Sequence, residues 1–556
     1  MKRWADFLSR YFSFHWKRPL SGSGVVWTLL LVLLVGIFVR TYHFREWLHF
    51  GSDQARDVML VGDVIDGRES LPLLGMEAGN TRFDLGPAYY YLQIASARMF
   101  GVRPETVAYP DLLLSILTIP LSFFLFRKLF DRHLSLALTG LYAISFYVVE
   151  YSRFAWNPNA IPFFVGLFLL SLTEFMETEE KTAWWWILAL GTAIGIGIQL
   201  HTILLFLFPA ILFGVFLMFL KKNIGVIARV FGIVVLVLAL NIPQIVSEVQ
   251  THGKNTKLFF KALTDRSESG SSRFAESLET DILCHAQANS HILSSLGHHG
   301  NCDFLTLLLS SEKFANFHTL ALSYGGIIVS VLSSSIGYGL LIFLAFKESD
   351  PRRRKFLFVI LIYSSLSFLI LFSVIRGAPL RYFIHATFIP FLLLGLFLVW
   401  IRKHCRFSGM LVAGIIGVLA LLNIRAIGIE AAALASGTRG DAGFVVLGEA
   451  ENMVAYMKER SGSWTEANLA GGTAYFSTYY KSLKYIAAQQ GLDIHLAKRK
   501  HPPVSEVPYF FIYRPLDQRD PSFARGYDVL DSRDFGNMGI YHLQSTKYRD
   551  QEHLTR

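Results

Sequence analysis

Long apolar segments alternate with short polar ones over the first 430 residues of the chain. A helix of roughly 20 residues crosses about 30 Å of hydrocarbon, and eleven apolar runs of about this length predict membrane-spanning segments. They lie at 23–41, 109–126, 134–149, 159–176, 184–199, 202–220, 225–246, 321–346, 356–375, 382–401 and 408–428. The first is expected to be retained, because its exit at 39–42 lacks the small residues beside which signal peptidases cut.

The basic residues between these segments predict how the chain is oriented. Loops rich in Lys and Arg stay in the cytoplasm, and a cytoplasmic N-terminus places all the basic clusters on that side, at 2–18, 127–132, 221–222, 352–355 and 402–406. An additional span at Pro87–Gly101 would reverse this for every later cluster. That short, aromatic stretch is therefore expected to be an amphipathic helix in the outer interface, within a first outer loop at 42–108.

Beyond the last span the composition changes, since charged residues become frequent and apolar runs become short. Residues 436–556 are therefore expected to form a small extracytoplasmic α/β domain, separate from a transmembrane domain at 1–430. Helices are predicted at 445–460 and 478–490, and strands at 509–513 and 539–543. A second outer loop, 248–320, is long enough to act as a lid over a binding pocket.

The composition is that of a membrane protein, with 53% hydrophobic and only 17% charged residues in 556. The formal net charge of +10 could indicate nucleic-acid binding. Because the basic excess lies in the predicted cytoplasmic loops, topology explains it sufficiently, and we expect no nucleic-acid partner.

Unusual polar residues gather at the predicted outer ends of the spans. Such groups are costly at that depth unless they are paired, solvated or functional. The candidates are Asp53, Arg56, Asp57, Asp84 and Tyr89 in the first outer loop, Glu150, Arg153 and Asn157 after the third span, His201 after the fifth, and Arg376 and Arg381 before the tenth.

This placement suggests transfer of a sugar from a lipid phosphate. The lipid tail would hold the donor in the bilayer with its anomeric carbon at the interface. A carboxylate there can accept the proton of an incoming hydroxyl as general base, and arginines can bind the phosphate as negative charge develops on the leaving oxygen. No glycine-rich loop that would cradle a soluble nucleotide is evident.

Four segments resemble the GT-C glycosyltransferases, in the branch of the aminoarabinose transferases and the protein O-mannosyltransferase-like enzymes. They are Asp53-Gln54-Ala55-Arg56-Asp57, Asp84-Leu85-Gly86-Pro87-Ala88-Tyr89-Tyr90-Tyr91, Glu150-Tyr151-Ser152-Arg153-Phe154-Ala155-Trp156-Asn157-Pro158 and Arg381-Tyr382. Each segment alone is a weak motif. Their order along the chain and their predicted location on the same side of the membrane make the combination specific. The resemblance implies a polytopic GT-C fold of about eleven helices and an inverting transfer.

The resemblance also implies roles for individual residues. Asp53 falls where the family has its catalytic carboxylate, and Asp84 where a second acid opens the next interfacial segment. Many relatives carry Asp-Pro where this chain has Asn157-Pro158. Because Asn cannot act as a base, we expect Asn157 to bind sugar or to orient Asp53. No cofactor is certain, although a divalent metal near Asp53 and Asp84 is one expectation.

Each candidate also has a structural explanation. Asp53 could cap a helix, Glu150 and Arg153 could form an ion pair, and His201 could be a hydrogen-bonded structural histidine. Arg381 could be a snorkelling anchor, and Asp84 could serve an ordinary turn.

The three cysteines fall in two predicted compartments. Cys284 and Cys302 lie in the second outer loop among several histidines, where a disulfide, a metal cluster and free thiols are all open. Cys405 lies in a cytoplasmic basic loop and is expected to be a free thiol.

The favoured function is transfer of a sugar from a polyprenyl-phosphate donor to a lipid, glycan or protein acceptor at the cytoplasmic membrane of a prokaryote. A transporter or lipid flippase would also need many spans, but it predicts ionisable groups near mid-membrane. A polysaccharide polymerase or ligase would use the same bond chemistry with a glycan acceptor. The sequence identifies neither the sugar nor the acceptor.

Overall fold

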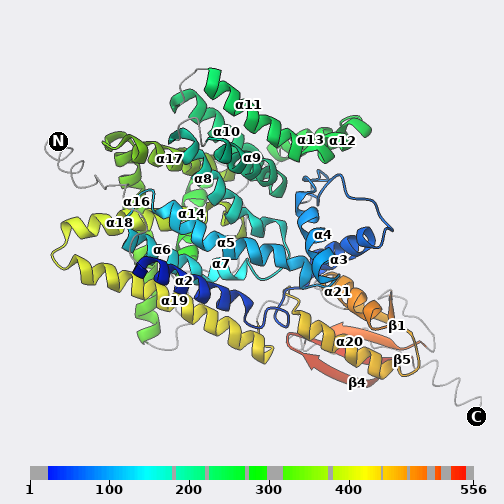
Figure 1. Ribbon diagram of the computed structural model, residues 1–556. Coiled ribbons are helices and arrows are strands. Elements are labelled where there is room, and N and C mark those ends of the chain that lie inside the picture. Colours follow the sequence, from blue (N-terminus) through cyan, green and yellow to red (C-terminus); the bar gives the residue numbers. More distant parts are fainter. Residues whose placement is uncertain are drawn as a thin grey trace, which may run out of the picture.

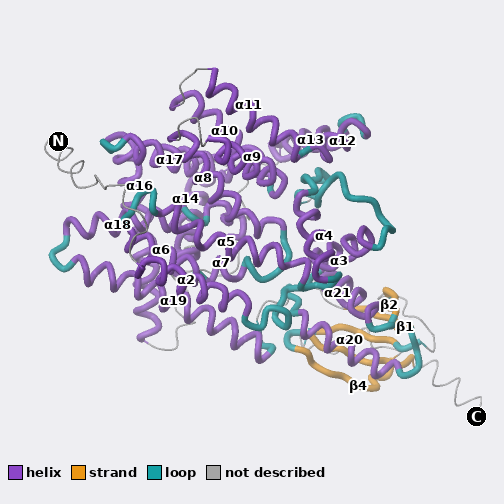
Figure 2. The backbone as a smooth tube through the Cα atoms, viewed as in Figure 1, coloured by secondary structure: helices purple, strands orange, loops and turns teal. Residues whose placement is uncertain are grey.

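The computed structural model describes a helical bundle joined to a small sheet domain (Figures 1 and 2). The described residues are 23–79, 81–177, 183–219, 224–268, 274–296, 317–372, 380–439, 443–471, 476–497, 507–514 and 527–545. The bundle includes α2 (Ser23–Thr41), α5 (Tyr109–Phe126), α6 (Arg132–Ile144), α7 (Phe146–Glu150), α8 (Ile161–Glu177), α9 (Ala183–Leu200), α10 (Thr202–Phe219), α11 (Ile224–Leu240), α16 (Phe317–Lys347), α17 (Pro351–Phe372), α18 (Ile389–His404) and α19 (Ser408–Ser436).

Among the described residues, seven helices are long and apolar enough to cross a membrane, and two bent pairs would raise this to nine. The bent pairs are α11 with α12 (Ile242–Gln250) and the 3₁₀ helix η5 (Leu380–Ala386) with α18. The apolar helix α9 is shorter. The polytopic helical architecture is therefore confirmed, whereas the number eleven stays a prediction.

The flanks of the bundle expose large apolar side chains, as expected of a surface that contacts lipid. Trp27, Phe213, Phe231 and Leu421 are each more than half exposed. In water so much uncovered apolar surface would favour association, whereas hydrocarbon accommodates it.

The two ends of the bundle differ in chemistry. At the end that we call the basic end, Lys128 forms an ion pair with Glu174, Arg402 with Asp131 at 2.9 Å, and Arg353 donates to the Leu129 carbonyl at 2.8 Å. Three of the predicted cytoplasmic clusters are thus neighbours in space. The opposite end, which we call the site end, carries the first loop, the segment 150–157 and η5.

One predicted span, 134–149, is broken at Ser145 into α6 and α7, which is a difference from the sequence prediction. The break is stable because side chains replace the missing helical hydrogen bonds. Ser145 Oγ donates to the Ile292 carbonyl at 2.7 Å, and Asn423 Oδ1 accepts the Phe146 N–H at 2.9 Å. Neither distant partner could be identified from the local sequence.

The predicted spans 225–246 and 382–401 are also broken, with bends of 60° and 65°. In the first, Pro243 stands in the first turn of α12, where its missing N–H costs nothing. Asn241 at the break donates to the carbonyls of Gly195 and Val237 at 3.1 and 2.8 Å. In the second, Pro390 opens α18 in the same way.

Where the sequence predicts one outer loop at 248–320, the structure has α13 (Lys254–Glu268) and α14 (Phe274–Ser294) after the end of α12. α14 contacts α16, α17, α18 and α19, so it belongs to the packed bundle. Within it, Cys284 is fully buried and disulfide-bonded, whereas Cys405 is a free thiol. Cys302 lies outside the described residues, and a lid function stays a prediction.

The C-terminal region forms a five-stranded sheet with two helices. The elements are α20 (Leu447–Ser461), β1 (Glu466–Gly471), α21 (Phe476–Gln489), β2 (Asp493–Leu496), β3 (Tyr509–Tyr513), β4 (Tyr527–Phe535) and β5 (Met538–Ser545). The strand order is β2-β1-β3-β5-β4. β1 runs parallel to β2 and β3, with Asn468 opposite Tyr509, and β5 runs antiparallel to β3 and β4.

All four elements predicted for this region are present, but β1, β2 and β4 were missed. Of these, β2 and β4 are edge strands, and edges tolerate the charged residues that make a strand hard to recognise. β2 buries only Ile494, and β4 carries Asp528, Asp531, Arg533 and Asp534.

The sheet domain packs on the first loop, whose helices are α3 (Ser52–Ile65) and α4 (Ala88–Phe100). Phe50 N–H donates to the Val445 carbonyl at 2.8 Å, and Leu447 N–H donates to the Leu48 carbonyl at 2.9 Å. The Phe50 ring lies 5.6 Å from that of Tyr485 in α21. In Figure 1, α3 and α4 accordingly lie beside the sheet domain.

We predict that Asn423→Ala strongly destabilises the protein. Fully buried Asn423 accepts from Phe146 N–H and donates to the Leu293 carbonyl at 2.7 Å, so its loss leaves several buried polar groups unpaired, at about 1–3 kcal/mol each. Unfolding temperature in detergent should fall clearly, while exposed Asn452→Ala serves as the matched control. Equal unfolding temperatures for the two variants would contradict this.

Candidate functional site

The first turn of α3 is fixed by the amide side chain of Gln54. Its Oε1 accepts the Gly51 N–H at 3.0 Å, and its Nε2 donates to the Ala155 carbonyl at 2.7 Å. One side chain therefore both caps the helix start and ties it to the segment 150–157. The sequence analysis quoted Gln54 only as part of a motif.

Asp53, Arg56 and Asp57 form one cluster on this turn, as their spacing predicts. Arg56 bridges the two acids, at 3.1 Å from Asp53 Oδ1 and 2.8 Å from Asp57 Oδ1. The Asp53 side chain is 62% exposed, whereas that of Asp57 is 2% exposed. Asp53 is thus the carboxylate that a substrate can reach, and Asp57 is a buried partner that holds Arg56.

The two faces of this cluster differ electrostatically. Burial raises the pKa of Asp57 to about 6, against the lowering effect of Arg56 and of the Tyr90 hydroxyl at 3.3 Å. The free-energy cost of burying the carboxylate therefore exceeds the gain from its ion pair, which is common for buried ion pairs. Asp53 stands in the first turn of the same helix, where an acidic side chain interacts favourably with the helix dipole.

Asp84 lies apart from this cluster and is held by α13. Its N–H donates to Asn255 Oδ1 at 2.8 Å, and Asn255 Nδ2 donates to its carbonyl at 2.9 Å. Partial burial and nearby Glu77 raise the pKa of the Asp84 carboxyl, while Lys254 opposes them. The structure thus brings Asp84 beside α13. Within the described residues, Asp84 and Asp53 share no hydrogen bond or ion pair.

The hydroxyl of Tyr89 is hydrogen-bonded to a carboxylate that the sequence analysis missed. Its hydroxyl donates to Asp111 Oδ2 at 2.6 Å, and both side chains are buried. Asp111 opens α5 and is an ionisable residue at the end of a predicted span, which is the signal that could have identified it. The pair fixes α4 against the bundle.

In the segment 150–157, Glu150 and Arg153 have separate partners rather than each other. Glu150 lies 3.0 Å from Arg439 Nη2. Arg153 donates to four carbonyls at the end of α2, including those of Arg40 at 2.9 Å and Tyr42 at 2.8 Å, and burial lowers its pKa to about 10. A cation at the carboxyl end of a helix is favoured by the helix dipole.

Asn157 and His201 meet the end of α9. Asn157 Nδ2 donates to the Leu200 carbonyl at 2.6 Å. His201 Nδ1 accepts the Ile203 N–H at 3.1 Å, and burial lowers the pKa of His201 to about 4, so the ring is neutral. Both side chains therefore help to join α8, α9 and α10 at the site end.

Arg381 is exposed, and its guanidinium lies 5.7 Å from the centre of the Trp156 ring. Trp156 in turn stacks on Phe154 at 6.1 Å. Arg381 is thus placed over the segment that Gln54 ties to α3. Arg376 lies outside the described residues.

No group of three or more His, Cys, Asp or Glu side chains that could hold a metal ion occurs in the described part of the chain. Asp53 is paired with Arg56, and Asp84 lies beside Glu77 and Lys254. We therefore derive no step through a metal.

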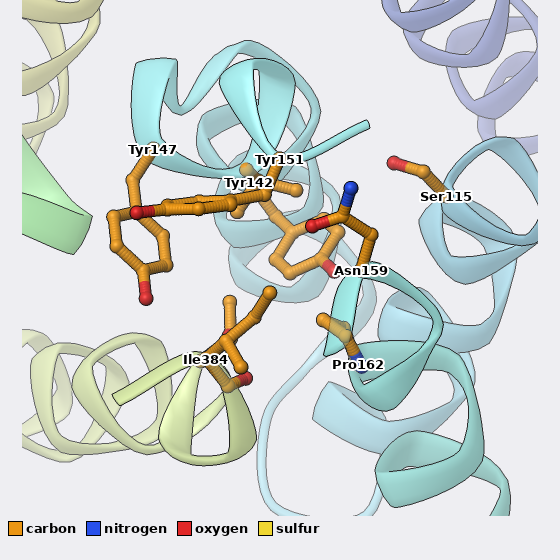
Figure 3. Close-up of a pocket in the computed structure, with 9 residues that line it drawn as sticks. Ser115, Tyr142, Tyr147, Tyr151, Asn159, Pro162 and Ile384 are labelled. Atoms are coloured by element: carbon orange, nitrogen blue, oxygen red, sulfur yellow. The ribbon is translucent and has the colours of Figure 1, made fainter. Parts of the chain in front are cut away.

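A very small cavity lies next to the segment 150–157, to which Tyr151 belongs. Its lining comprises Ser115, Tyr142, Tyr147, Val148, Tyr151, Asn159, Pro162, Ile384 and Thr387. Figure 3 shows the side chains of Tyr142, Tyr147 and Tyr151 gathered with those of Asn159, Pro162 and Ile384, with Ser115 further to the right. None of the predicted acids lines this cavity, so the catalytic proposal does not rest on it.

Part of the chain matches a mannosyltransferase family model and the fold is that of the solved ArnT structures, in agreement with the resemblance to the GT-C glycosyltransferases. Residues 84–246 match the family model described as dolichyl-phosphate-mannose-protein mannosyltransferase. This range includes the segments around Asp84 and Glu150. No curated protein matches the chain in sequence.

Two solved structures of ArnT show the same fold over nearly the whole chain. ArnT from Cupriavidus metallidurans in the apo state has a TM-score of 0.52 at 13% identity, covering 95% of this chain and 99% of ArnT. ArnT bound to undecaprenyl phosphate has a TM-score of 0.50 at 13% identity, covering 94% and 98%. The apo oligosaccharyltransferase of Archaeoglobus fulgidus has a TM-score of 0.48 at 12% identity, covering 89% and 70%.

We predict that Asp57 makes the fold less stable as pH rises from about 4 to about 6. The folded protein holds the Asp57 proton up to a pKa of about 6, whereas the unfolded chain loses it near the ordinary value of 3.8, so stability falls across this window. Asp57→Asn should remove the fall, so the difference in unfolding free energy between the variant and wild type should shift in the variant's favour by up to about 3 kcal/mol between pH 4 and pH 7. Unfolding temperature against pH measures this.

The control for this titration is Asp63→Asn, whose side chain on the same helix is 39% exposed and pairs with exposed Arg68. If the difference between Asp57→Asn and wild type does not change between pH 4 and 7, the raised pKa of Asp57 is wrong.

Proposed function

We propose that the protein transfers a sugar from a polyprenyl-phosphate donor to a hydroxyl group of a lipid, glycan or protein acceptor, with inversion at the anomeric carbon. The observation that carries this proposal is the exposed carboxylate of Asp53 beside Arg56, in a chain with the fold of ArnT. One ArnT structure is bound to undecaprenyl phosphate, which supports a donor of this class.

In the proposed reaction, Asp53 accepts the proton of the acceptor hydroxyl. The freed oxygen attacks the anomeric carbon, and the bond from that carbon to the phosphate oxygen breaks. The lipid phosphate leaves with the additional negative charge. A positioned general base contributes typically 10²–10⁴-fold to such a step.

Arg56 and Arg381 are the arginines best placed to bind the phosphate. Arg381 is exposed, and the Arg56 side chain is 40% exposed beside Asp53. Arg153 stays a candidate from the family resemblance, but its donors are directed at the carbonyls that end α2. We assign Asp84, Tyr89, Glu150, Asn157 and His201 to the shaping of the sugar and acceptor sites.

We place the reaction on the extracytoplasmic side of a prokaryotic cytoplasmic membrane. The support is the distribution of charge, since Lys128, Arg353 and Arg402 meet at the basic end and such clusters stay in the cytoplasm. The site end and the sheet domain then face outward.

We predict that Asp53→Asn abolishes transfer while the protein stays folded. The amide cannot accept the proton, so the rate should fall by about 10²–10⁴-fold. The measurement is transfer of radiolabelled sugar from a panel of polyprenyl-phosphate sugars into endogenous acceptors, using membranes with matched expression. The productive donor then identifies the sugar.

The matched control is Asp66→Asn, because Asp66 ends the same helix and its exposed side chain pairs with Arg68. Transfer by Asp53→Asn at the rate of the control would remove Asp53 from catalysis. A folded wild-type protein that transfers no sugar from any donor, with acceptors present, would overturn the proposed function.

We predict that Arg381→Ala raises the KM for the lipid donor. A charge-assisted hydrogen bond to phosphate contributes about 1.5–3 kcal/mol, which corresponds to roughly a 10- to 100-fold increase. Initial rates against donor concentration measure the effect. An unchanged KM would show that Arg381 does not contact the donor.

A further inference from the structure

Arg439 stands where the last bundle helix meets the sheet domain, and it is joined to both. Its side chain is 8% exposed and forms ion pairs with Glu430 of α19 at 2.6 Å and with Glu150 at 3.0 Å. Its carbonyl accepts a hydrogen bond from Asn537 in the turn between β4 and β5. The buried Arg439 thus contacts α19, the segment 150–157 and the sheet domain.

A line of aromatic rings runs from Arg439 to the candidate site. The Arg439 guanidinium lies 3.3 Å from the centre of the Phe444 ring, which stacks on His49 at 4.3 Å. His49 meets Phe154 edge-on at 5.4 Å, and Phe154 stacks on Trp156 at 6.1 Å. We call these four residues, Phe444, His49, Phe154 and Trp156, the aromatic bridge.

The far end of the aromatic bridge is Arg381, which lies over Trp156. Two guanidinium groups therefore lie at the two ends of one line of ring contacts, and ring–ring and cation–π contacts hold their members in defined orientations. Tyr151 lies beside this line, since its ring is 5.9 Å from that of Trp156. Burial raises the pKa of Tyr151, while Arg381 and Arg439 oppose the rise.

The same junction reaches the start of α3. His49 pairs with Val446 in an antiparallel bridge, and it lies two residues before Gly51, where Gln54 begins its cap. A shift of Phe444 would therefore move the chain that leads into Asp53 and the segment below Arg381 together.

We propose that Arg439 is a positioning residue for sugar transfer, and that the aromatic bridge makes the sheet domain part of the catalytic unit by fixing α3 and Arg381 relative to each other. This inference rests on the proposed function for its catalytic consequence, but not for the coupling itself. Displacement of reacting groups by about 1 Å can lower a rate by about 10²-fold, so loss of the bridge affects the reaction.

The experiment compares Phe444→Leu, Arg439→Lys and Arg439→Ala with wild type. Phe444→Leu keeps both ion pairs and removes only the ring between Arg439 and His49. Arg439→Lys keeps the charge but cannot reproduce the planar contacts of the guanidinium. The control is Arg460→Ala, because Arg460 forms an exposed ion pair with Asp531 on the same domain.

Two readouts are measured on the full-length protein in lipid nanodiscs. Hydrogen exchange reports the order of residues 46–57 and 150–157, and initial rates give kcat and the donor KM. We expect Phe444→Leu and Arg439→Lys to speed exchange in both segments and to lower kcat/KM about tenfold, with unfolding temperatures near that of wild type. Arg439→Ala should show larger changes, and Arg460→Ala none.

The outcomes separate this inference from the proposed function. Exchange and kcat/KM unchanged in both Phe444→Leu and Arg439→Lys would overturn the positioning role. Faster exchange in a protein that transfers no sugar in the wild-type form would support the coupling while overturning the transfer. An equal response of Arg460→Ala would show a general loosening of the domain, and would also overturn the inference.

Discussion

The placement of the start of α3 between the bundle and the sheet domain is the constraint on which the site depends. Gln54 ties the helix to the Ala155 carbonyl on one side, and Phe50 and Leu48 pair with 445–447 on the other. A single helical turn exposed at a membrane surface would otherwise fray, because short helices take their stability from tertiary contacts. Asp53 can be exposed and still well positioned because the residues next to it are held in place by these contacts.

The same need for a fixed framework explains why some charged groups around the site are buried in ion pairs or hydrogen bonds while others stay accessible. Arg56 is shared between an exposed and a buried acid, so one acid fixes the guanidinium while the other stays accessible. Arg153 donates its hydrogen bonds to the carbonyls that end α2, and Glu150 forms an ion pair with Arg439. Residues that look equivalent in the sequence thus divide into those that hold the framework and those that a substrate can reach.

Much of the fold could be predicted from the sequence, because membrane spans and basic clusters are strong local signals. The breaks at Ser145 and the packing of α14 could not, since they depend on distant partners such as Asn423 and Ile292. The cluster of Asp53, Arg56 and Asp57 follows from helical spacing alone. In contrast, the partners of Glu150, Tyr89 and Asp84 are 289, 22 and 171 residues away, beyond what local pattern can reveal.

The sheet domain contributes to the surroundings of the candidate site through few side chains. Its sequence carries no recognisable catalytic motif, yet it contributes the strand-like segment 445–447 and the Phe444 ring to the surroundings of α3. The contacts are backbone hydrogen bonds and ring stacking, which demand few specific residues. A domain attached in this way can change in sequence while its contacts with the first loop are kept.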